Sequence, residues 1–405
     1  MARLRLLIVA LDNWYGSARL PCCLGRAGFE VGLLAPPGIF AAQSRGVDRL
    51  FPLAPEGTPH ALERPGWLAI EAFAPDFIVP GDEKSVRLLA FMATSRSAPT
   101  SPGVRSMLLR SLPSRPSLLG RDAMTAIAAD AGLTCPEHAA VRSLDEALRV
   151  AERMGWPVYL KRDNTAGGNG VRQCGDRAAL AVQFAQLTRT DMSPWSAEGT
   201  LRRGRQWLRS LGIGGDPGIT IQAAIPGAPA FHTAVALDGK WLAGISADVE
   251  EFHPRPTGPS TRVRLHGDPA MDDLARRLIA ALGYNGFCGL DFIRRPDGGL
   301  TFLEFNARPT PVAHLGKLVG TDLGVALHAA LSGEPVAAPL PALPQRVALF
   351  PQDWLRDPHS AGRAGCHLDI PTDDPALLEA LGALLPKGWD DPGLRSRLTP
   401  LPSCG

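Results

Sequence analysis

Several patterns that would assign a function are missing from this sequence of 405 residues. The seven cysteines contain no CxxC pair and the nine histidines no HxxxH spacing, so no structural zinc site is predicted. The 42 basic and 40 acidic residues are interspersed and leave a net charge of +2, which argues against a nucleic-acid partner. Lysine is scarce beside arginine, an imbalance that we attribute to coding bias rather than to chemistry.

Long apolar runs are also missing. No run reaches the roughly 18 apolar residues that a membrane span needs. The N-terminus has a short apolar core, but acidic and aromatic residues follow it where a signal-peptide cleavage site would lie. We therefore expect a cytoplasmic protein with no membrane partner, for which a homodimer is one compatible assembly.

The N-terminal region has a strand, helix, strand pattern. Residues 4–10 (LRLLIVA) form a continuous apolar run, an amphipathic stretch covers Ser17–Ala27, and a second apolar run covers Glu30–Leu34. The sequence DFIVP at 76–80 predicts another strand, which is followed by a helix over Ser85–Ala93. This alternation is typical of a parallel sheet, in which the loops at the strand ends commonly carry ligand contacts.

The remaining length predicts two or three domains in all. A Ser- and Pro-rich segment at 97–117 predicts the first boundary, and the polar segment 188–218, which holds Trp195 and Trp207, predicts a surface helical insertion. Around that insertion we expect a mixture of helices at Arg121–Ala131, 144–155 and Pro269–Leu282 and strands at 156–163, Ile219–Ala223, Phe231–Leu237 and Trp241–Ala247.

Two proline-rich segments interrupt the second half of the chain. Glu250–Ser260 (EEFHPRPTGPS) predicts a mobile or lid-like loop. PVAAPLPALP at 335–344 predicts a linker, and the residues beyond it predict a small appendage, in which the segment 348–358 suggests nothing beyond packing.

The first chemical signal is the stretch LDFIRRPDGGLTFLEFNARP at 290–309. If Asp297-Gly298 is a two-residue hairpin turn, Asp291 faces Glu304, Leu290 faces Phe305 and Phe292 faces Leu303. One face of the hairpin is then apolar, while two carboxylates lie on the other at a separation of about 5 Å. At an effective dielectric constant near 20, that repulsion costs roughly 3 kcal/mol, so a cation is expected between them.

The second signal is the sequence VYLKRDNTAGGNGV at 158–171. It places Lys161 near the end of a strand and Gly167, Gly168 and Gly170 in the turn beyond it. Glycines let backbone N–H groups approach a phosphate without interference from a Cβ atom. The lysine precedes the glycines and a strand follows them, so the stretch is neither a P-loop nor a GxGxxG turn that opens a helix. A flexible turn without a ligand is the alternative.

The two signals fit together if the acids hold a metal ion beside bound phosphates. Mg²⁺ prefers oxygen ligands, usually one or two carboxylates completed by phosphates and water, and Mn²⁺ is the alternative ion. Asn306 and Arg308 follow Glu304 at intervals of two and so share its face of the strand. Asn306 can supply or orient a ligand oxygen, whereas Arg308 can grip an anion in a bidentate way.

With these residues the chain resembles the ATP-grasp superfamily, of the carboxylate-amine ligase type. The resemblance covers residues 1 to about 335, and the DFI…LEFNARP ending is its most specific part. It implies an α/β fold with a parallel-sheet domain in residues 1–112, then an α+β ATP-grasp domain pair in 113–335. The lid subdomain would span about 136–225, and 336–405 would form the linker and C-terminal appendage.

The resemblance also implies how ATP is held. Arg121 and Lys161 would contact the phosphates, the glycine loop would cover them, and Asp291, Glu304 and Asn306 would bind Mg²⁺. Adenine would be read in the hinge segment TIQAAIPG by Gln222, Ala223, Ala224 and Ile225. Two positions depart from the family, because a lysine is usual where this chain has Arg121, and the hinge commonly offers a glutamate where this chain reads Gln222-Ala223-Ala224.

The function implied is an ATP-dependent ligase that joins a small carboxylate to an amine, or to a thiol, through an acyl phosphate. In this reaction Lys161 and Arg308 would be catalytic, and ADP and phosphate would be released. A kinase or carboxylase-like enzyme and a nucleotide-binding protein without turnover are the alternatives. Arg262 and Arg264 could reach the same anionic centre or be solvated strand-edge residues. Substrate choice is expected from three loops, namely Asp12–Ser17, Gly81–Lys84 and Glu250–Ser260.

Overall fold

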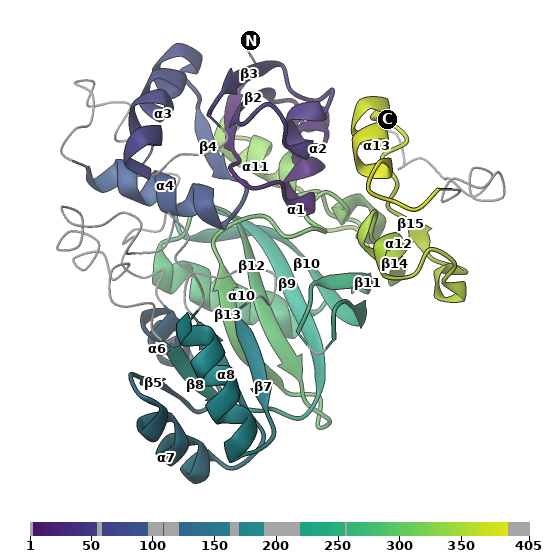
Figure 1. The fold of residues 1–405 in the computed structure, drawn as a ribbon. Helices are drawn as coiled ribbons and strands as arrows, with labels where there is room; N and C mark the ends of the chain where they lie inside the picture. Colours follow the sequence, from purple (N-terminus) through teal and green to yellow (C-terminus); the bar gives the residue numbers. More distant parts are fainter. Residues whose placement is uncertain are drawn as a thin grey trace.

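The computed structural model of the chain describes residues 3–54, 59–95, 108, 121–162, 170–189, 219–255 and 257–387. Three β-sheets with helices around them make up the described part, in the order shown in Figure 1. Some predictions lie outside the described residues: the glycines Gly167 and Gly168, the helical insertion beyond residue 189, and the boundary segment 97–117 apart from Leu108.

The N-terminal sheet is parallel, as the sequence predicts. Its order is β3-β2-β1-β4, with strands β3 (Arg49–Pro52), β2 (Glu30–Ala35), β1 (Arg5–Val9) and β4 (Phe77–Pro80). Around it lie α1 (Tyr15–Ala18), α2 (Leu20–Arg26), η1 (Phe40–Gln43), α3 (Pro59–Phe73) and α4 (Glu83–Thr94). The helix predicted over Ser17–Ala27 is divided into α1 and α2, and Pro21, which has no N–H to donate, lies in the first turn of α2.

The central sheet has seven strands in the order β13-β12-β9-β10-β11-β14-β15. The strands are β9 (Ala228–Leu237), β10 (Lys240–Phe252), β11 (Ser260–His266), β12 (Gly286–Arg294), β13 (Leu300–Asn306), β14 (Gln345–Ala348) and β15 (His367–Leu368). β10 is longer than predicted, so the proposed lid loop is a hairpin end confined to residues 253–259. The last two strands extend the sheet from the C-terminal segment, a role that the sequence pattern does not predict.

The third sheet is antiparallel and lies at the end of the molecule away from the N-terminal sheet (Figure 1). Its order is β5-β8-β6-β7, with β5 (His138–Val141), β8 (Ile219–Ala223), β6 (Val158–Arg162) and β7 (Val171–Cys174). The helices α7 (Leu144–Met154) and α8 (Arg177–Arg189) contact it and share its hydrophobic core. This sheet carries Lys161 on β6 and the hinge residues at the end of β8.

The remaining helices are α6 (Arg121–Asp130), α10 (Pro269–Leu282), η3 (Gly316–Val319), α11 (Leu323–Ser332), α12 (Gln352–Arg356), η4 (Ala361–Arg363) and α13 (Pro375–Gly382). α10 has the predicted bounds, because Asp268 caps its N-terminus and Gly283 ends it in the left-handed conformation. Among the described residues, no helix has the length and apolar character needed to cross a membrane.

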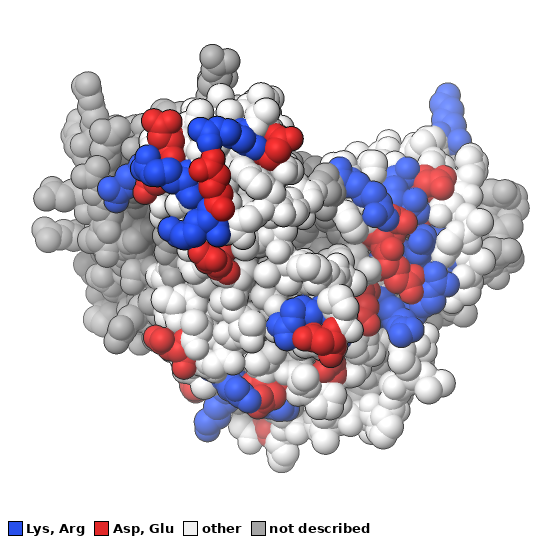
Figure 2. Space-filling view, turned by 90° about the horizontal axis from the view of Figure 1, so that it is seen from below, with Lys and Arg blue, Asp and Glu red and all other residues white. Residues whose placement is uncertain are grey.

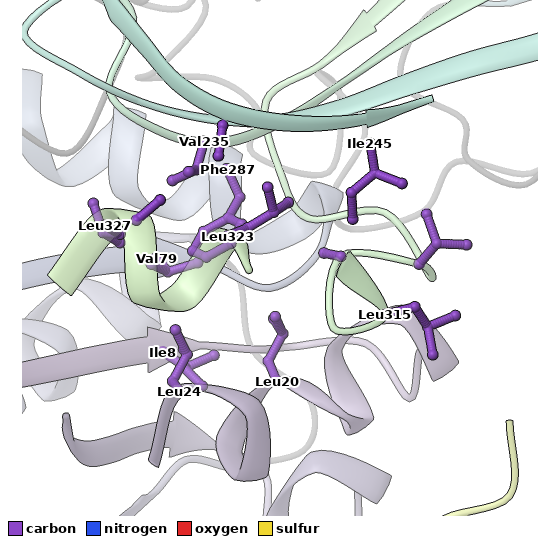
Figure 3. Packing of buried hydrophobic residues seen from close by; sticks show 14 of the residues in the cluster. Ile8, Leu20, Leu24, Val79, Val235, Ile245, Phe287, Leu315, Leu323 and Leu327 are labelled. Carbon is purple, nitrogen blue, oxygen red and sulfur yellow. The ribbon is translucent and has the colours of Figure 1, made fainter. Parts of the chain in front are cut away.

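One hydrophobic core joins the N-terminal sheet to the central sheet (Figure 3). Ile8 of β1 and Leu24 of α2 belong to the same buried cluster as Leu327 of α11, Val235 of β9 and Phe287 of β12. Because α11 packs against β9, β10 and α2, it fills the space between the two sheets. The loops at the ends of β1 and β4 are therefore held in a fixed position relative to β12 and β13.

The described surface in Figure 2 carries acidic and basic side chains side by side, without an extended area of one sign. The interspersed charges of the sequence are thus interspersed on this face as well. The functional site is therefore better sought in a pocket than on this surface.

Candidate functional site

The β12–β13 hairpin brings the two predicted acids together. Asp291 pairs with Glu304 and Leu290 with Phe305, as predicted, but Phe292 pairs with Phe302 rather than with Leu303. The turn is one residue longer than predicted, because Arg294 pairs with Leu300 and the Arg295 N–H donates to Gly299 O. A β-bulge between Asp291 and Phe292 compensates for the extra residue, so the facing acids keep their register.

The pKa of Asp291 is raised at this position of the hairpin. Burial, followed by the charge of Glu304, raises the pKa of Asp291 to about 6, although the nearby charges of Arg308 and Lys161 oppose the shift. The Asn306 amide donates to Asp291 through Nδ2, at 3.0 Å from Oδ2. The ionised form of Asp291 is therefore costly in this structure, as the sequence predicts for two facing carboxylates.

Asn306 and Arg308 share the face of the acids. Arg308 Nη2 donates to Asn306 Oδ1 at 3.3 Å, so the Asn306 amide is bonded in a way that orients Asp291. Arg308 Nε also donates to Glu83 Oε2 at 3.3 Å, and its guanidinium carbon lies 5.7 Å from the centroid of the Trp14 ring. The arginine is 12% exposed, so its position is fixed from several sides.

These residues line a pocket of about 370 Å³. The central sheet contributes an apolar wall that includes Phe231, Val249 and Phe292, and the third sheet contributes Lys161, Gln222 and Ala223. The polar lining also includes residues of the hairpin and of the N-terminal loops: Asp291, Glu304, Asn306, Arg308, Thr310, Glu83 and Trp14. One cavity thus joins the two signals that the sequence presents 130 residues apart.

Lys161 enters this pocket from β6 and is buried. It faces Val171 of β7 and Thr220 of β8, and it is close enough to Asp291 to influence the pKa of that acid. Gly170 directly precedes β7, and its carbonyl accepts from Arg162 N–H at 2.9 Å. Of the predicted glycine loop, only this end is in the part of the chain that the structure describes.

The hinge after β8 forms another edge of the pocket. Gln222, Ala223 and Ile225 line it, whereas Ala224 is absent from the lining residues. Ala223 N–H is bonded to Glu137 O and Ala224 N–H to Pro157 O. A nucleobase in this pocket would therefore meet the backbone near Ala223 and Ile225, and the amides of Ala223 and Ala224 are already committed to the sheet.

Arg121 is the first residue of α6, and its side chain is outside the described part of the structure. The alternative that Arg262 and Arg264 reach the anionic centre is wrong for this structure. Arg262 ion-pairs with Glu250, Glu251 and Asp353 instead, and neither arginine is among the residues that line the pocket. On β11 their side chains lie beside the C-terminal strand β14, with which both residues pair.

The three loops expected to choose the substrate each contribute to the pocket. Trp14 comes from the loop after β1, Glu83 from the first residue of α4, directly after the loop that follows β4, and Thr257–Ser260 from the end of the β10–β11 hairpin. The sequence identifies these loops but not the side chains that point inward. Thr310, which also lines the pocket, carries no signal in the sequence beyond its place after Arg308 and Pro309.

The donor set fits Mg²⁺. Asp291 and Glu304 are hard oxygen donors, and a cation between them would offset the cost of ionising Asp291 that its raised pKa reports. Among the residues that the structure describes, no cluster of three or more His, Cys, Asp and Glu side chains could enclose an ion. Mg²⁺ held by one or two carboxylates commonly leaves its other positions to phosphate and water.

Part of the chain matches a family of known proteins. The family model for the ATP-binding domain of the carbamoyl-phosphate synthase L chain matches residues 120–201. The carbamoyl phosphate synthase large chain of Micrococcus luteus is 24% identical over 221 residues, which are 51% of this chain and 17% of that relative. The chain thus spans only a small part of the relative's length.

Two solved structures have a similar fold. The L-amino acid ligase of Bacillus licheniformis matches with a TM-score of 0.56 and 17% identity, over 85% of this chain and 80% of the other. The biotin carboxylase domain of the Hydrogenobacter thermophilus 2-oxoglutarate carboxylase, a dimer with MgADP and bicarbonate, matches with a TM-score of 0.56 and 15% identity. That match covers 84% of this chain and 72% of the other.

The three sheets and the pocket between them form a fold that these solved structures share. Residues 120–201 match the ATP-binding domain family, and the fold of the chain is similar to that of the L-amino acid ligase and the biotin carboxylase domain named above. The family resemblance and the α/β fold class inferred from the sequence are confirmed. The domain limits and the roles of the individual site residues stay predictions.

Proposed function

We propose that this protein is an ATP- and Mg²⁺-dependent ligase that activates a small carboxylate as an acyl phosphate and transfers the acyl group to an amine. The observation that carries the proposal is the common pocket of Asp291, Glu304, Lys161 and Arg308. Two acids, a lysine and an arginine converge there, which suits transfer of a terminal phosphoryl group between anions.

In the first step a carboxylate oxygen attacks the terminal phosphorus of ATP, and the bond to ADP breaks. Mg²⁺ held by Asp291 and Glu304 would neutralise charge on the phosphate oxygens. Lys161 reaches the same region from β6 and stabilises charge that develops on the transferred group. Arg308 holds the acid, because its guanidinium can bind two carboxylate oxygens at once.

In the second step the amine nitrogen attacks the carbonyl carbon of the acyl phosphate. Phosphate leaves with the electrons of the broken C–O bond and takes up the proton that the nitrogen loses. The apolar wall formed by residues such as Phe231 and Phe292 limits water at the pocket, which protects the activated acid from hydrolysis. A thiol in place of the amine would follow the same course and give a thioester.

Bicarbonate is the second candidate for the acid. It is supported by one observation, the bicarbonate in the complex of the Hydrogenobacter thermophilus biotin carboxylase domain. The product of the first step would then be carboxyphosphate, and the enzyme would carboxylate its acceptor.

Hydroxylamine supplied in place of the amine tests the proposal. A panel of carboxylic acids and, separately, bicarbonate is incubated with enzyme, ATP and Mg²⁺, and hydroxamate, ADP and AMP are measured. We expect a hydroxamate and an equal amount of ADP with the correct acid only, and at least a tenfold loss of trapping in Arg308→Lys, because an ammonium cannot form the bidentate contact.

The exposed Arg64→Lys serves as the matched control and should trap as well as the wild type. AMP formed in an amount equal to the hydroxamate would contradict the acyl-phosphate route. ADP formed with a phosphorylated alcohol would identify a kinase, and ADP formed only with bicarbonate would identify the carboxylating enzyme. ATP that binds without any turnover would identify a nucleotide-binding protein.

A further inference from the structure

One end of the pocket is built by side chains for which the steps above have no use. Glu83, the first residue of α4, and Trp14, in the loop after β1, line the pocket beside Arg308 and Thr310. The other charged side chains that line the pocket are the ones assigned above to ATP, the metal ion and the carboxylate: Lys161, Asp291, Glu304 and Arg308. A further carboxylate at this end would repel both the acid substrate and the phosphates, so its presence calls for a positive partner.

Arg308 satisfies Glu83 only in part. Their contact is a single hydrogen bond of 3.3 Å from Arg308 Nε to Glu83 Oε2, whereas an ionised carboxylate can accept about four. The Glu83 side chain is 34% exposed, so it can be reached from the pocket. The Trp14 ring stands next to the same arginine and offers an aromatic face to a cation.

The loop that carries Trp14 and the start of α4, which carries Glu83, are held firmly. The buried Asp82 carboxylate accepts N–H bonds from Leu11 at 2.6 Å and Asp12 at 3.0 Å, and it also caps α4 by accepting from Ser85 at 2.8 Å. Trp14 packs so closely over Gly16 that a Cβ atom there would lie 2.3 Å from the indole nitrogen. The polar end of the pocket is therefore formed before any ligand arrives.

Thr310 points independently to a missing ligand. The residue is 6% exposed and lines the pocket, and its hydroxyl has no hydrogen-bond partner among the described residues. Its methyl group is the atom nearest to Gly289, 2.5 Å from where a Cβ would stand there. Buried hydroxyl groups are rarely left unpaired, so a polar group of a ligand is the natural partner here.

We propose that Glu83, Trp14 and Thr310 form a subsite for a primary ammonium group on the acid substrate, which is then an amino acid with a free amino group. The inference rests on the proposed function. Arg308 would hold the carboxylate and Glu83 the ammonium, and because the two residues touch, the two charges of the substrate must also be close together. A nitrogen held by a carboxylate stays protonated, which suits a group that is recognised rather than one that attacks.

The experiment again uses hydroxylamine as the nucleophile, so that no amine substrate has to be bound. Amino acids, the same compounds with an acetylated amino group and the corresponding acids without nitrogen are compared with the full-length protein, ATP and Mg²⁺. We expect the wild type to form hydroxamate from the correct free amino acid at least tenfold more efficiently than from its two analogues. Efficient use of an acetylated acid would overturn the subsite.

Two variants test whether Glu83 and Thr310 bind the ammonium group. Glu83→Gln should raise KM for the amino acid by about 10- to 100-fold, leave KM for ATP unchanged, and abolish the preference for the free amino group. Thr310→Val keeps the shape of the side chain and should raise the same KM roughly three- to tenfold without lowering the melting temperature. The exposed Glu71→Gln in α3 is the matched control and should behave as the wild type.

The remaining outcomes separate this inference from the proposed function. A loss in Glu83→Gln that falls on kcat alone, with the substrate preference retained, would mean that Glu83 only positions Arg308 and would overturn the inference. A change confined to KM for an amine nucleophile, measured without hydroxylamine, would place the ammonium on the other substrate and would also overturn it. Failure of the wild type to form any hydroxamate would instead count against the ligase itself.

Discussion

Replacement of Asp291 by asparagine should stabilise the metal-free protein while it abolishes activity. The new amide would keep an oxygen that accepts from Asn306 Nδ2, but the substitution would remove one of two facing negative charges. The pKa of Asp291 is raised from 3.8 to about 6, chiefly by burial and then by Glu304. At 1.36 kcal/mol per pKa unit, the ionised form costs about 3 kcal/mol at pH 7.

The Coulomb repulsion expected from the strand spacing is of the same size, roughly 3 kcal/mol for charges about 5 Å apart at a dielectric constant near 20. Partial solvent contact reduces the gain that can be measured. We therefore expect the free energy of unfolding of Asp291→Asn to exceed that of the wild type by about 1–3 kcal/mol at pH 7.5 without metal.

The stability difference between Asp291→Asn and the wild type should depend on pH, whereas a difference caused by packing alone should not. A carboxyl group with a raised pKa destabilises the folded state above that pKa, and the cost disappears as the folded protein takes up a proton. The advantage of Asp291→Asn should therefore be full above pH 7 and should vanish as the pH falls from about 6 to about 4. Wild type and variant should then unfold alike in acid.

Urea unfolding at several pH values, with EDTA or with Mg²⁺ and ATP, measures these effects. Mg·ATP should stabilise the wild type and stabilise the variant much less, and phosphate release by the variant should be lost. Asp297→Asn in the same hairpin is the matched control, because the pKa of the exposed Asp297 is lowered by hydrogen bonds and its neutralisation should not stabilise. A metal-free Asp291→Asn less stable than the wild type at pH 7.5, or one with full turnover, would refute the reasoning.

Two further predictions concern charges at other places. Lys161→Met should lower kcat/KM by about 100-fold or more, because in the proposed mechanism the lysine stabilises charge that develops in the transition state. A variant as active as the control Lys240→Met, at the exposed start of β10, would contradict this role. Asp353→Asn should destabilise the protein by about 3 kcal/mol in urea unfolding, because the buried carboxylate pairs with Arg262, Arg356 and Arg363. The exposed Asp273→Asn is the control and should leave stability unchanged. An equally unchanged stability in Asp353→Asn would show that its ion pairs do not stabilise the fold.

Much of the site can be predicted from the sequence, because short sequence patterns identify its charged residues. The facing of Asp291 and Glu304 follows from strand alternation, although the predicted turn is one residue too short. The register survives because the bulge beside Asp291 absorbs the difference. Lys161 is identified by its position before a glycine-rich turn, which is also a local feature.

The rest depends on contacts between distant segments. Arg262 resembles a ligand for an anion until the C-terminal segment, almost 100 residues later, places Asp353 beside it. Likewise, the sequence indicates the loops near Trp14 and Glu83 as substrate loops, but not that these two side chains lie beside Arg308, more than 200 residues away. Such partners are brought together by the packing of the sheets, and spacing along the chain does not encode them.

The hydrophobic cluster through α11 has a consequence for any attempt to divide the chain. Because Ile8 and Leu24 share a core with Val235, Phe287 and Leu327, a cut between the first sheet and the rest would leave two fragments with apolar faces in water. Neither fragment alone should be soluble as a folded unit, and the two expressed together should reassociate into an active enzyme. The first sheet is therefore not expected to work as a separate domain. Replacement of the loops that follow β1 and β4 should be tolerated better, because it would not alter the hydrophobic cluster that the two sheets share.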